Sequence, residues 1–128
     1  MRGFTLIEML VVLVILGMAA ALVAPALART AERVRESGER EDVRRLLQAM
    51  PALARQQGHA LVWDAGMPMA LPGRDWPEGW QVVALSPIRI AANGWCSGGE
   101  LQARGGETTM HFAVNAPDCR LVLRDDVP

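Results

Sequence analysis

Few residues of this 128-residue chain have the types and spacings that catalysis requires. The sequence contains no GxSxG motif, no phosphate-binding loop and no cluster of metal-ligand residues. Its two histidines, His59 and His111, stand far apart on expected strands, where each is more simply a partly exposed strand residue than a catalyst. Asp125 and Asp126 lack the several oxygen ligands that calcium requires, so we interpret them as a solvated tail. We therefore expect no enzyme activity, no metal and no cofactor.

One acid stands in an unusual place, at the start of a long apolar segment. Residues 9–28 contain no charged or hydrogen-bonding side chain, and Glu8 directly precedes them. A carboxylate facing lipid costs on the order of 2.5–3.5 kcal/mol, so Glu8 needs a cationic partner unless it is solvated at the headgroup level. Cleavage between Gly3 and Phe4 would create an ammonium about 6 Å, or one helical turn, before Glu8. That ammonium could neutralise Glu8 of the same subunit, or of a neighbour displaced by one turn.

The apolar segment is long enough to span a bilayer. Its twenty residues give about 30 Å of helix, which matches the hydrocarbon thickness. Arg2 weakly favours a cytoplasmic N-terminus, although Arg29 and Arg33 dilute that signal. The alternative is a secretory signal peptide cleaved after Ala26-Leu27-Ala28, which would release a binding domain that begins at Arg29. Against it, the segment exceeds the usual apolar region of about 7–15 residues, and Glu8 stands where positive charge is expected.

The residues Gly3-Phe4-Thr5-Leu6-Ile7-Glu8, followed by the apolar run Met9 to Gly17, resemble the cleavage and methylation segment of type IV prepilins and type II secretion pseudopilins. The resemblance implies that a prepilin peptidase cuts after Gly3 on the cytoplasmic side and methylates the new amine of Phe4. It also implies that Glu8 guides subunits into a filament. The implied location is the inner membrane, crossed once, with the C-terminal domain in the periplasm and incorporated into a periplasmic pseudopilus.

Two further residues of this segment have two interpretations. Gly17 and Pro25 match places where helices of these families loosen within fibres, which agrees with the weak helix propensity of both residues. Alternatively, each is a kink that a membrane helix tolerates.

The order of patterns predicts an α+β, pilin-like fold, in which a long N-terminal helix packs on an antiparallel sheet or a two-sheet domain. We expect a leader at 1–3, a membrane or filament-core helix at 4–28, its amphipathic continuation at 29–58 and a β-rich periplasmic region at 59–128. Apolar side chains recur at helical spacing in the continuation, at Val43, Leu46, Leu47, Met50, Leu53 and Ala54.

The amphipathic continuation also carries charges and breakers. Charged residues between Arg29 and Arg45 mix signs at short helical spacings, which suits a solvated helix face, the interpretation we favour, or contacts between subunits. Pro51 should bend the helix, and Gly58 is a plausible C-terminal stop.

Beyond Gly58 the period changes to short runs separated by turn residues, which predicts an antiparallel meander. The expected strands lie near His59–Trp63, Gln81–Leu85, Ile88–Ala92, Glu100–Ala103, Met110–Val114 and Arg120–Leu123. Pro77 and Gly79 suit a tight turn, and Asn93-Gly94 and Gly105-Gly106 suit hairpin connections.

The cysteines and tryptophans of the distal part have structural interpretations. Cys96 and Cys119 lie in a part of the chain expected to be exported, where disulfide pairing is the default; two buried free thiols are the alternative.

The chain has four tryptophans: Trp63, Trp76, Trp80 and Trp95. They are most simply core or rim residues, and we expect at most one of them to anchor a neighbouring subunit.

A second, weaker resemblance covers the distal part. The segments 46–58, 88–94, 97–101 and 119–123 are similar in order and spacing to the H-type minor pseudopilins and the related FimT minor pilins. It implies a minor subunit that initiates or caps the type II secretion pseudopilus, with other pseudopilins and the inner-membrane secretion platform as partners. The FimT alternative implies pilus assembly or DNA uptake. The net charge of −1, with arginines scattered among acids, gives no basic face, so we expect no nucleic-acid partner.

Overall fold

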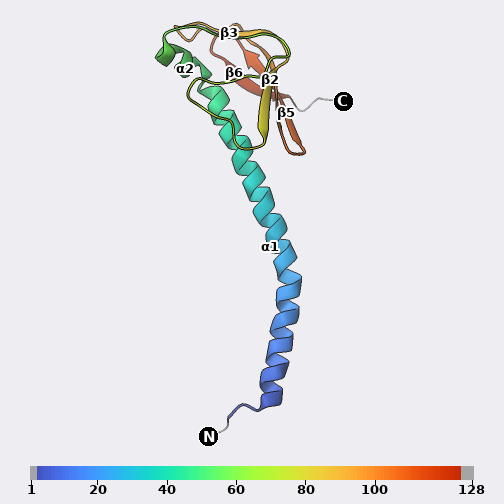
Figure 1. Cartoon of the computed structure of the whole chain (residues 1–128). Coiled ribbons are helices and arrows are strands. Elements are labelled where there is room, and N and C mark those ends of the chain that lie inside the picture. The colour runs from blue at the N-terminus through green and yellow to red at the C-terminus, as the bar shows by residue number, and fades with distance from the viewer. Residues whose placement is uncertain (1–2, 125–128) are drawn as a thin grey trace. The chain divides into compact units, whose positions relative to one another are not determined.

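The computed structural model describes residues 3–124 of the chain, shown in Figure 1. The chain divides into two compact units between Gly38 and Glu39, and each is described here by itself. We call them the helical unit, up to Gly38, and the globular unit, from Glu39 onward. The long N-terminal helix and the antiparallel sheets confirm the predicted α+β, pilin-like layout.

The helix α1 runs over Leu6–Gln48 and continues through Gly17 and Pro25. It remains an α-helix there although proline has no N–H to donate to the preceding turn. Large apolar side chains from Leu6 to Leu27 are exposed around the helix. Because a helix that is apolar on all sides is unfavourable in water, this surface needs lipid or other helices around it.

The expected bend at Pro51 takes the form of a break two residues earlier. The helix α1 ends at Gln48, and α2 covers Met50–Gln57 with Pro51 in its first turn. A proline fits the first turn because the N–H it lacks would have no partner there. The helix α2 ends as predicted at Gly58, which has a φ of 72° and donates its N–H to the Ala54 carbonyl.

The globular unit contains two sheets, which is the second of the two expected layouts, and the expected meander is wrong for β1 and β3. In the smaller sheet β1 pairs with β3, and in the larger sheet the order is β2-β4-β5-β6, with all neighbours antiparallel. The bounds are Leu61–Trp63 for β1, Trp80–Ala84 for β2, Ile88–Ile90 for β3, Gly99–Gly105 for β4, Thr108–Asn115 for β5 and Arg120–Arg124 for β6.

The connection after β2 explains why β3 leaves the larger sheet. The N–H groups of Leu85 and Ser86 both donate to the Glu100 carbonyl, at 2.8 and 3.3 Å. The chain therefore remains hydrogen-bonded to β4 for two residues after β2 ends. Pro87, which follows, has no N–H with which to begin a hairpin. The strand β3 pairs instead with β1, which lies far earlier in the sequence.

Several element boundaries also differ from the predictions. His59 lies in the bend after α2, not on a strand, and its Nδ1 is 3.0 Å from the Gln57 carbonyl oxygen. Asn93 and Gly94 form a tight turn as expected. After this turn, however, the chain forms only an isolated β-bridge, between Ile90 and Cys96, and not the second strand of a hairpin.

The other predicted turns are present. Gly105 pairs with Thr108 across the β4–β5 hairpin, and Gly106 adopts the left-handed conformation with a φ of 59°. The N–H of Trp80 donates to the Pro77 carbonyl at 3.0 Å, which closes the expected turn before β2.

The core of the globular unit confirms most of the predicted apolar positions. The helical side chains Val43, Leu47, Met50, Leu53 and Ala54 are buried, whereas Leu46 is partly buried. The strands add Leu61, Trp63, Trp80, Val82, Ala84, Ile88, Ile90, Leu101, Ala103, Phe112 and Val114.

Cys96 and Cys119 form the disulfide that was expected from the sequence, and this disulfide joins the two sheets. Their Cα atoms are 5.4 Å apart, and both residues are buried. Cys96 pairs with Ile90 of the smaller sheet, and Cys119 directly precedes β6 of the larger one. The N–H of Cys96 also donates to the Pro117 carbonyl at 2.9 Å, so the same junction is held by a backbone bond.

Candidate processing and assembly segment

The start of α1 is fixed by a reciprocal pair of contacts between Thr5 and Glu8. The N–H of Thr5 donates to Oε2 of Glu8 at 2.8 Å, and the N–H of Glu8 donates to Oγ1 of Thr5 at 3.2 Å. The Thr5 hydroxyl also lies 3.3 Å from Oε2. This arrangement is a capping box, which satisfies two backbone N–H groups that no helical carbonyl can reach.

The capping box was not predicted, although its sequence signature was present. A Thr, followed three residues later by a Glu and then by an apolar run, indicates a helix start with Thr5 as the cap. The residue Glu8 therefore has a local role that its position in the apolar segment did not reveal. Its negative charge in the first turn is also favourable beside the positive end of the helix dipole.

Gly3 and Phe4 lie before the helix, and both are exposed. Phe4 is 80% exposed, and the space around Gly3 is open. The peptide bond between them therefore lies in a non-helical segment, directly before the capping residue Thr5. A peptidase can reach such a bond without unwinding α1.

Within residues 3–124, one helix, α1, contains a span that is long and apolar enough to cross a membrane, and this span follows the capping box. None of its most apolar window is buried within the described structure. Gly17 has open space around it, and Pro25 is followed by a bond from the Thr30 hydroxyl to the Ala26 carbonyl at 3.0 Å. Their loosening within a fibre stays a prediction.

Among residues 3–124, no group of three His, Cys, Asp or Glu side chains is placed to hold a metal ion. His111 lies on β5 as predicted and faces Arg124 across the ladder, far from His59 in the sequence. The prediction for Asp125 and Asp126 falls outside the described residues.

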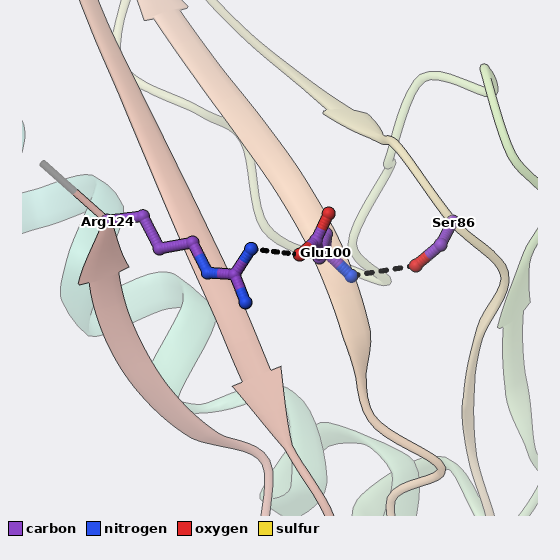
Figure 2. A network of polar contacts seen from close by, with 3 residues as sticks. All are labelled: Ser86, Glu100 and Arg124. Atoms are coloured by element: carbon purple, nitrogen blue, oxygen red, sulfur yellow. Dashed lines mark hydrogen bonds and ion pairs between the residues drawn. The ribbon is translucent and has the colours of Figure 1, made fainter. Parts of the chain in front are cut away.

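Polar contacts on the larger sheet connect strands to one another (Figure 2). Arg124 donates to the Glu100 carboxylate at 2.5 Å, and the backbone N–H of Glu100 donates to the Ser86 hydroxyl at 2.8 Å. Both charged side chains are about half exposed, and such pairs contribute about 0.2–1 kcal/mol. The Arg124–Glu100 pair links β6 to β4 across the intervening β5, and the Ser86 contact holds the connection after β2 to β4, so both contacts have a structural role.

The four tryptophans differ in exposure. Trp63 and Trp80 are buried, and Trp76 is partly buried with its indole N–H donating to the Met69 carbonyl at 2.7 Å. Trp95 is 50% exposed. Trp95 is therefore the tryptophan with the most surface available to a neighbouring subunit.

Comparison with known proteins gives one match. Residues 1–24 match the model of the prokaryotic N-terminal methylation motif. No curated protein and no solved structure matches the chain. The matched segment contains Gly3, Phe4, the capping box and most of the apolar run. The chain therefore carries the N-terminal methylation motif of prokaryotic prepilin-type proteins, on a helix that is long and apolar enough to cross a membrane.

Proposed function

We propose that this chain is a minor pseudopilin, a structural subunit of the initiation or tip region of a type II secretion pseudopilus. In this role it supports the export of folded proteins across the outer membrane and has no active site of its own. The observation that carries the proposal is the methylation motif with Glu8 at the head of an exposed apolar span. The H-type identity is supported by the resemblance of the distal segments and by the pilin-like layout.

Processing in this proposal begins at the exposed Gly3–Phe4 bond. A prepilin peptidase adds water across that amide and releases the leader of residues 1–3. It then transfers a methyl group from a sulfonium methyl donor to the new amine of Phe4, with a thioether and a proton released. The subunit then stays in the inner membrane through α1, with its globular unit in the periplasm.

The geometry of Glu8 suits a second partner after processing. Within residues 3–124, the contacts of its carboxylate with Thr5 all involve Oε2. The other oxygen, Oε1, therefore keeps its lone pairs for a further donor. The amine of Phe4 on an adjacent subunit, displaced by about one helical turn, can donate to Oε1 without breaking the cap. Assembly then removes the cost of a carboxylate in lipid.

The alternative is a FimT-like minor pilin of a type IV pilus, because the methylation motif fits both kinds of fibre. DNA binding by such a pilin needs arginines that are available to phosphates. The two arginines of β6 already face acids: Arg120 lies 3.7 Å from Asp118, and Arg124 pairs with Glu100. This pairing favours the secretion role.

Deleting the gene separates the two roles. We expect the deletion to abolish secretion of folded exoproteins and to leave surface pili and DNA uptake unchanged, with export restored by the full chain on a plasmid. Normal secretion with a loss of pili or of DNA uptake would reject the pseudopilin role in favour of the pilin. Genes for a secretin and a secretion ATPase beside this gene would support the first outcome.

A further inference from the structure

A pocket of about 350 Å³ lies beside the start of β2 in the globular unit. It is lined by residues 68–71 and 74–76 of the preceding loop and by residues 80–83 of β2. Most of this lining is apolar, and two tryptophans, Trp76 and Trp80, belong to it. We call it the β2 pocket. A volume of this size suits a small ligand or a few residues of a peptide.

Two residues of β2 direct their backbone groups toward this loop. The Val82 carbonyl accepts the N–H of Met69 at 2.7 Å, and the N–H of Trp80 donates to the Pro77 carbonyl at 3.0 Å. The N–H and the C=O of one strand residue lie on the same edge of the strand. The N–H of Val82 and the carbonyl of Trp80 therefore face the loop as well.

Neither of these two groups is hydrogen-bonded within residues 3–124. The Met69 carbonyl, which would complete the pair with the Val82 N–H, accepts the indole N–H of Trp76 at 2.7 Å instead. Val82 is 2% exposed and Trp80 is 7% exposed. Because buried backbone groups are almost always paired, these two groups call for a partner from outside the described part of the chain.

The Trp80 carbonyl receives no donor from the loop because the loop turns back on itself. After Met69, the next bridge joins Leu71 to Arg74 within the loop, and the N–H of Arg74 donates to the Leu71 carbonyl at 3.3 Å. The ladder beside β2 therefore stops at Met69, and the β2 pocket lies next to the part of β2 that the loop leaves unpaired.

The two unpaired groups have the arrangement that a strand edge presents to one residue of an added strand. They flank Gln81, which also lines the β2 pocket. In a parallel ladder, one residue donates its N–H to a carbonyl of the neighbouring strand and accepts from the N–H two positions further on. A single residue of an extended peptide can therefore pair with Trp80 and Val82 at the same time.

The side chains around the β2 pocket favour a neutral, apolar ligand. Arg74 and Asp75 both line it, and in the described part of the chain neither side chain forms a hydrogen bond or an ion pair. One charge of each sign gives no net attraction for an ion. The apolar lining instead suits an aliphatic side chain, because such a side chain gains free energy by leaving water.

We propose that the β2 pocket binds a short extended segment of another protein. One residue of that segment donates its N–H to the Trp80 carbonyl and accepts the N–H of Val82 with its own carbonyl. An apolar side chain of the same segment packs against the lining. The proposal goes beyond the proposed function, because it gives the globular unit a peptide-recognition site that does not depend on the contacts of Glu8.

Binding of a one-residue peptide mimic tests the pocket directly. The probe is N-acetyl-leucine N-methylamide, and the matched probe carries a methyl group on the leucine nitrogen, so that it cannot donate to the Trp80 carbonyl. Each probe is titrated into ¹⁵N-labelled full-length chain in detergent micelles, while NMR follows the Val82 amide. We expect a saturable downfield shift of this amide with the first probe. Half-saturation with the second should need an at least fivefold higher concentration.

Three results of this titration would overturn the inference. The first is the absence of a saturable shift, or equal binding of the two probes. The second is a long-lived water that keeps its cross-peak to the Val82 amide at the highest probe concentration, because a water would then be the occupant. The third is a Val82 shift that depends on the protein concentration without any probe, because a second copy of the chain would then be the occupant.

Replacing Trp76 should close the site. In Trp76→Phe the Met69 carbonyl loses the indole donor and is free to accept the N–H of Val82, so the affinity for the first probe should fall at least fivefold. The matched control Trp95→Phe changes an exposed tryptophan outside the pocket lining and should bind the probe as the native chain does. Native-like amide shifts of β4 and β5 show that each variant is folded. Unchanged binding by folded Trp76→Phe would contradict the proposed arrangement.

A photoreactive residue in place of Gln81 identifies the natural occupant. Gln81 is exposed and lines the β2 pocket, and the control position, Gln57, is exposed at the end of α2. Cells that produce the full chain are illuminated, and mass spectrometry maps the linked peptides. We expect position 81, but not position 57, to link to one segment of another protein, and this link to fall at least fivefold when Trp76→Phe is added.

The outcomes of the photocrosslinking separate the inference from the proposed function. No link from position 81, a link only to a second copy of the chain, or a link that Trp76→Phe leaves unchanged would overturn the inference. None of these measurements requires the chain to enter a fibre. A gene deletion that leaves secretion intact would therefore reject the proposed function without affecting this inference.

Discussion

The indole ring of Trp80 lies directly against Gly105, its partner across the β2–β4 ladder. A Cβ built on Gly105 would come within 2.2 Å of that ring, so no larger residue fits without moving it. The indole N–H donates to the Glu39 carboxylate at 3.0 Å, which fixes the ring at the end of the sheet. Glycine is needed here because of close approach, not because of its backbone conformation.

Replacing Gly105 should therefore destabilise the globular unit. We expect Gly105→Ala to lower the free energy of unfolding by about 1–3 kcal/mol, because overpacking displaces the buried Trp80 ring. Urea unfolding of the full chain in detergent, followed by tryptophan fluorescence, measures the change. The matched control is Gly38→Ala in the helix interior, where the space is open and alanine should stabilise by up to about 1 kcal/mol. Equal effects of the two substitutions would contradict the packing argument.

Removing the hydroxyl of Thr5 should loosen the start of α1. In Thr5→Ala the N–H of Glu8 loses its acceptor, and such a change costs about 0.5–2 kcal/mol of helix stability. We expect faster hydrogen exchange at the Glu8 amide and in the first turn, measured by NMR in detergent micelles. Thr5→Ser keeps the acceptor and should behave like the native chain. Unchanged exchange in Thr5→Ala would argue against the capping box.

Neutralising Glu8 should separate processing from assembly. The variant Glu8→Gln should insert and be cleaved at the Gly3–Phe4 bond much as the native chain is, because neither step uses the carboxylate in this account. Its incorporation into sheared fibres should fall severalfold, since the Phe4 amine of a neighbour has no anion to meet. Immunoblots of membrane and fibre fractions measure both quantities. Normal incorporation would show that charge pairing is unnecessary.

The disulfide should stabilise the globular unit even though the core is already packed. Replacing both Cys96 and Cys119 with serine should lower the free energy of unfolding by about 2–4 kcal/mol, largely because the unfolded chain gains freedom. Urea unfolding under oxidising conditions compares the variant with the native chain. Adding a reductant should shift the native midpoint toward that of the variant and leave the variant itself unchanged.

The sequence predicted the helix and the succession of strands along the chain well, because the change from helical to alternating periodicity is a local property. The end of α2 at Gly58 was predictable for the same reason, since glycine readily adopts the left-handed conformation of a helix cap. The helix breaks at Ala49 and not at Pro51, where the bend was predicted, because proline disturbs the helical turn that precedes it.

The partners of β3 were not predictable from local patterns. Ile88 and Ile90 fit a buried strand in either sheet, and the choice of β1 depends on bonds from Leu85 and Ser86 to the distant Glu100. The contact of Glu8 with Thr5 was not predicted, although a Thr followed three residues later by a Glu before an apolar run is a signature of a helix start.

The central claim is that the chain is processed at the Gly3–Phe4 bond and held by α1. Mass spectrometry of the N-terminal peptide, from protein recovered from native membranes, tests this claim most directly. The account predicts a chain that begins with N-methylated Phe4. A chain that begins at Met1, or at Arg29 after removal of the whole apolar segment, would contradict it.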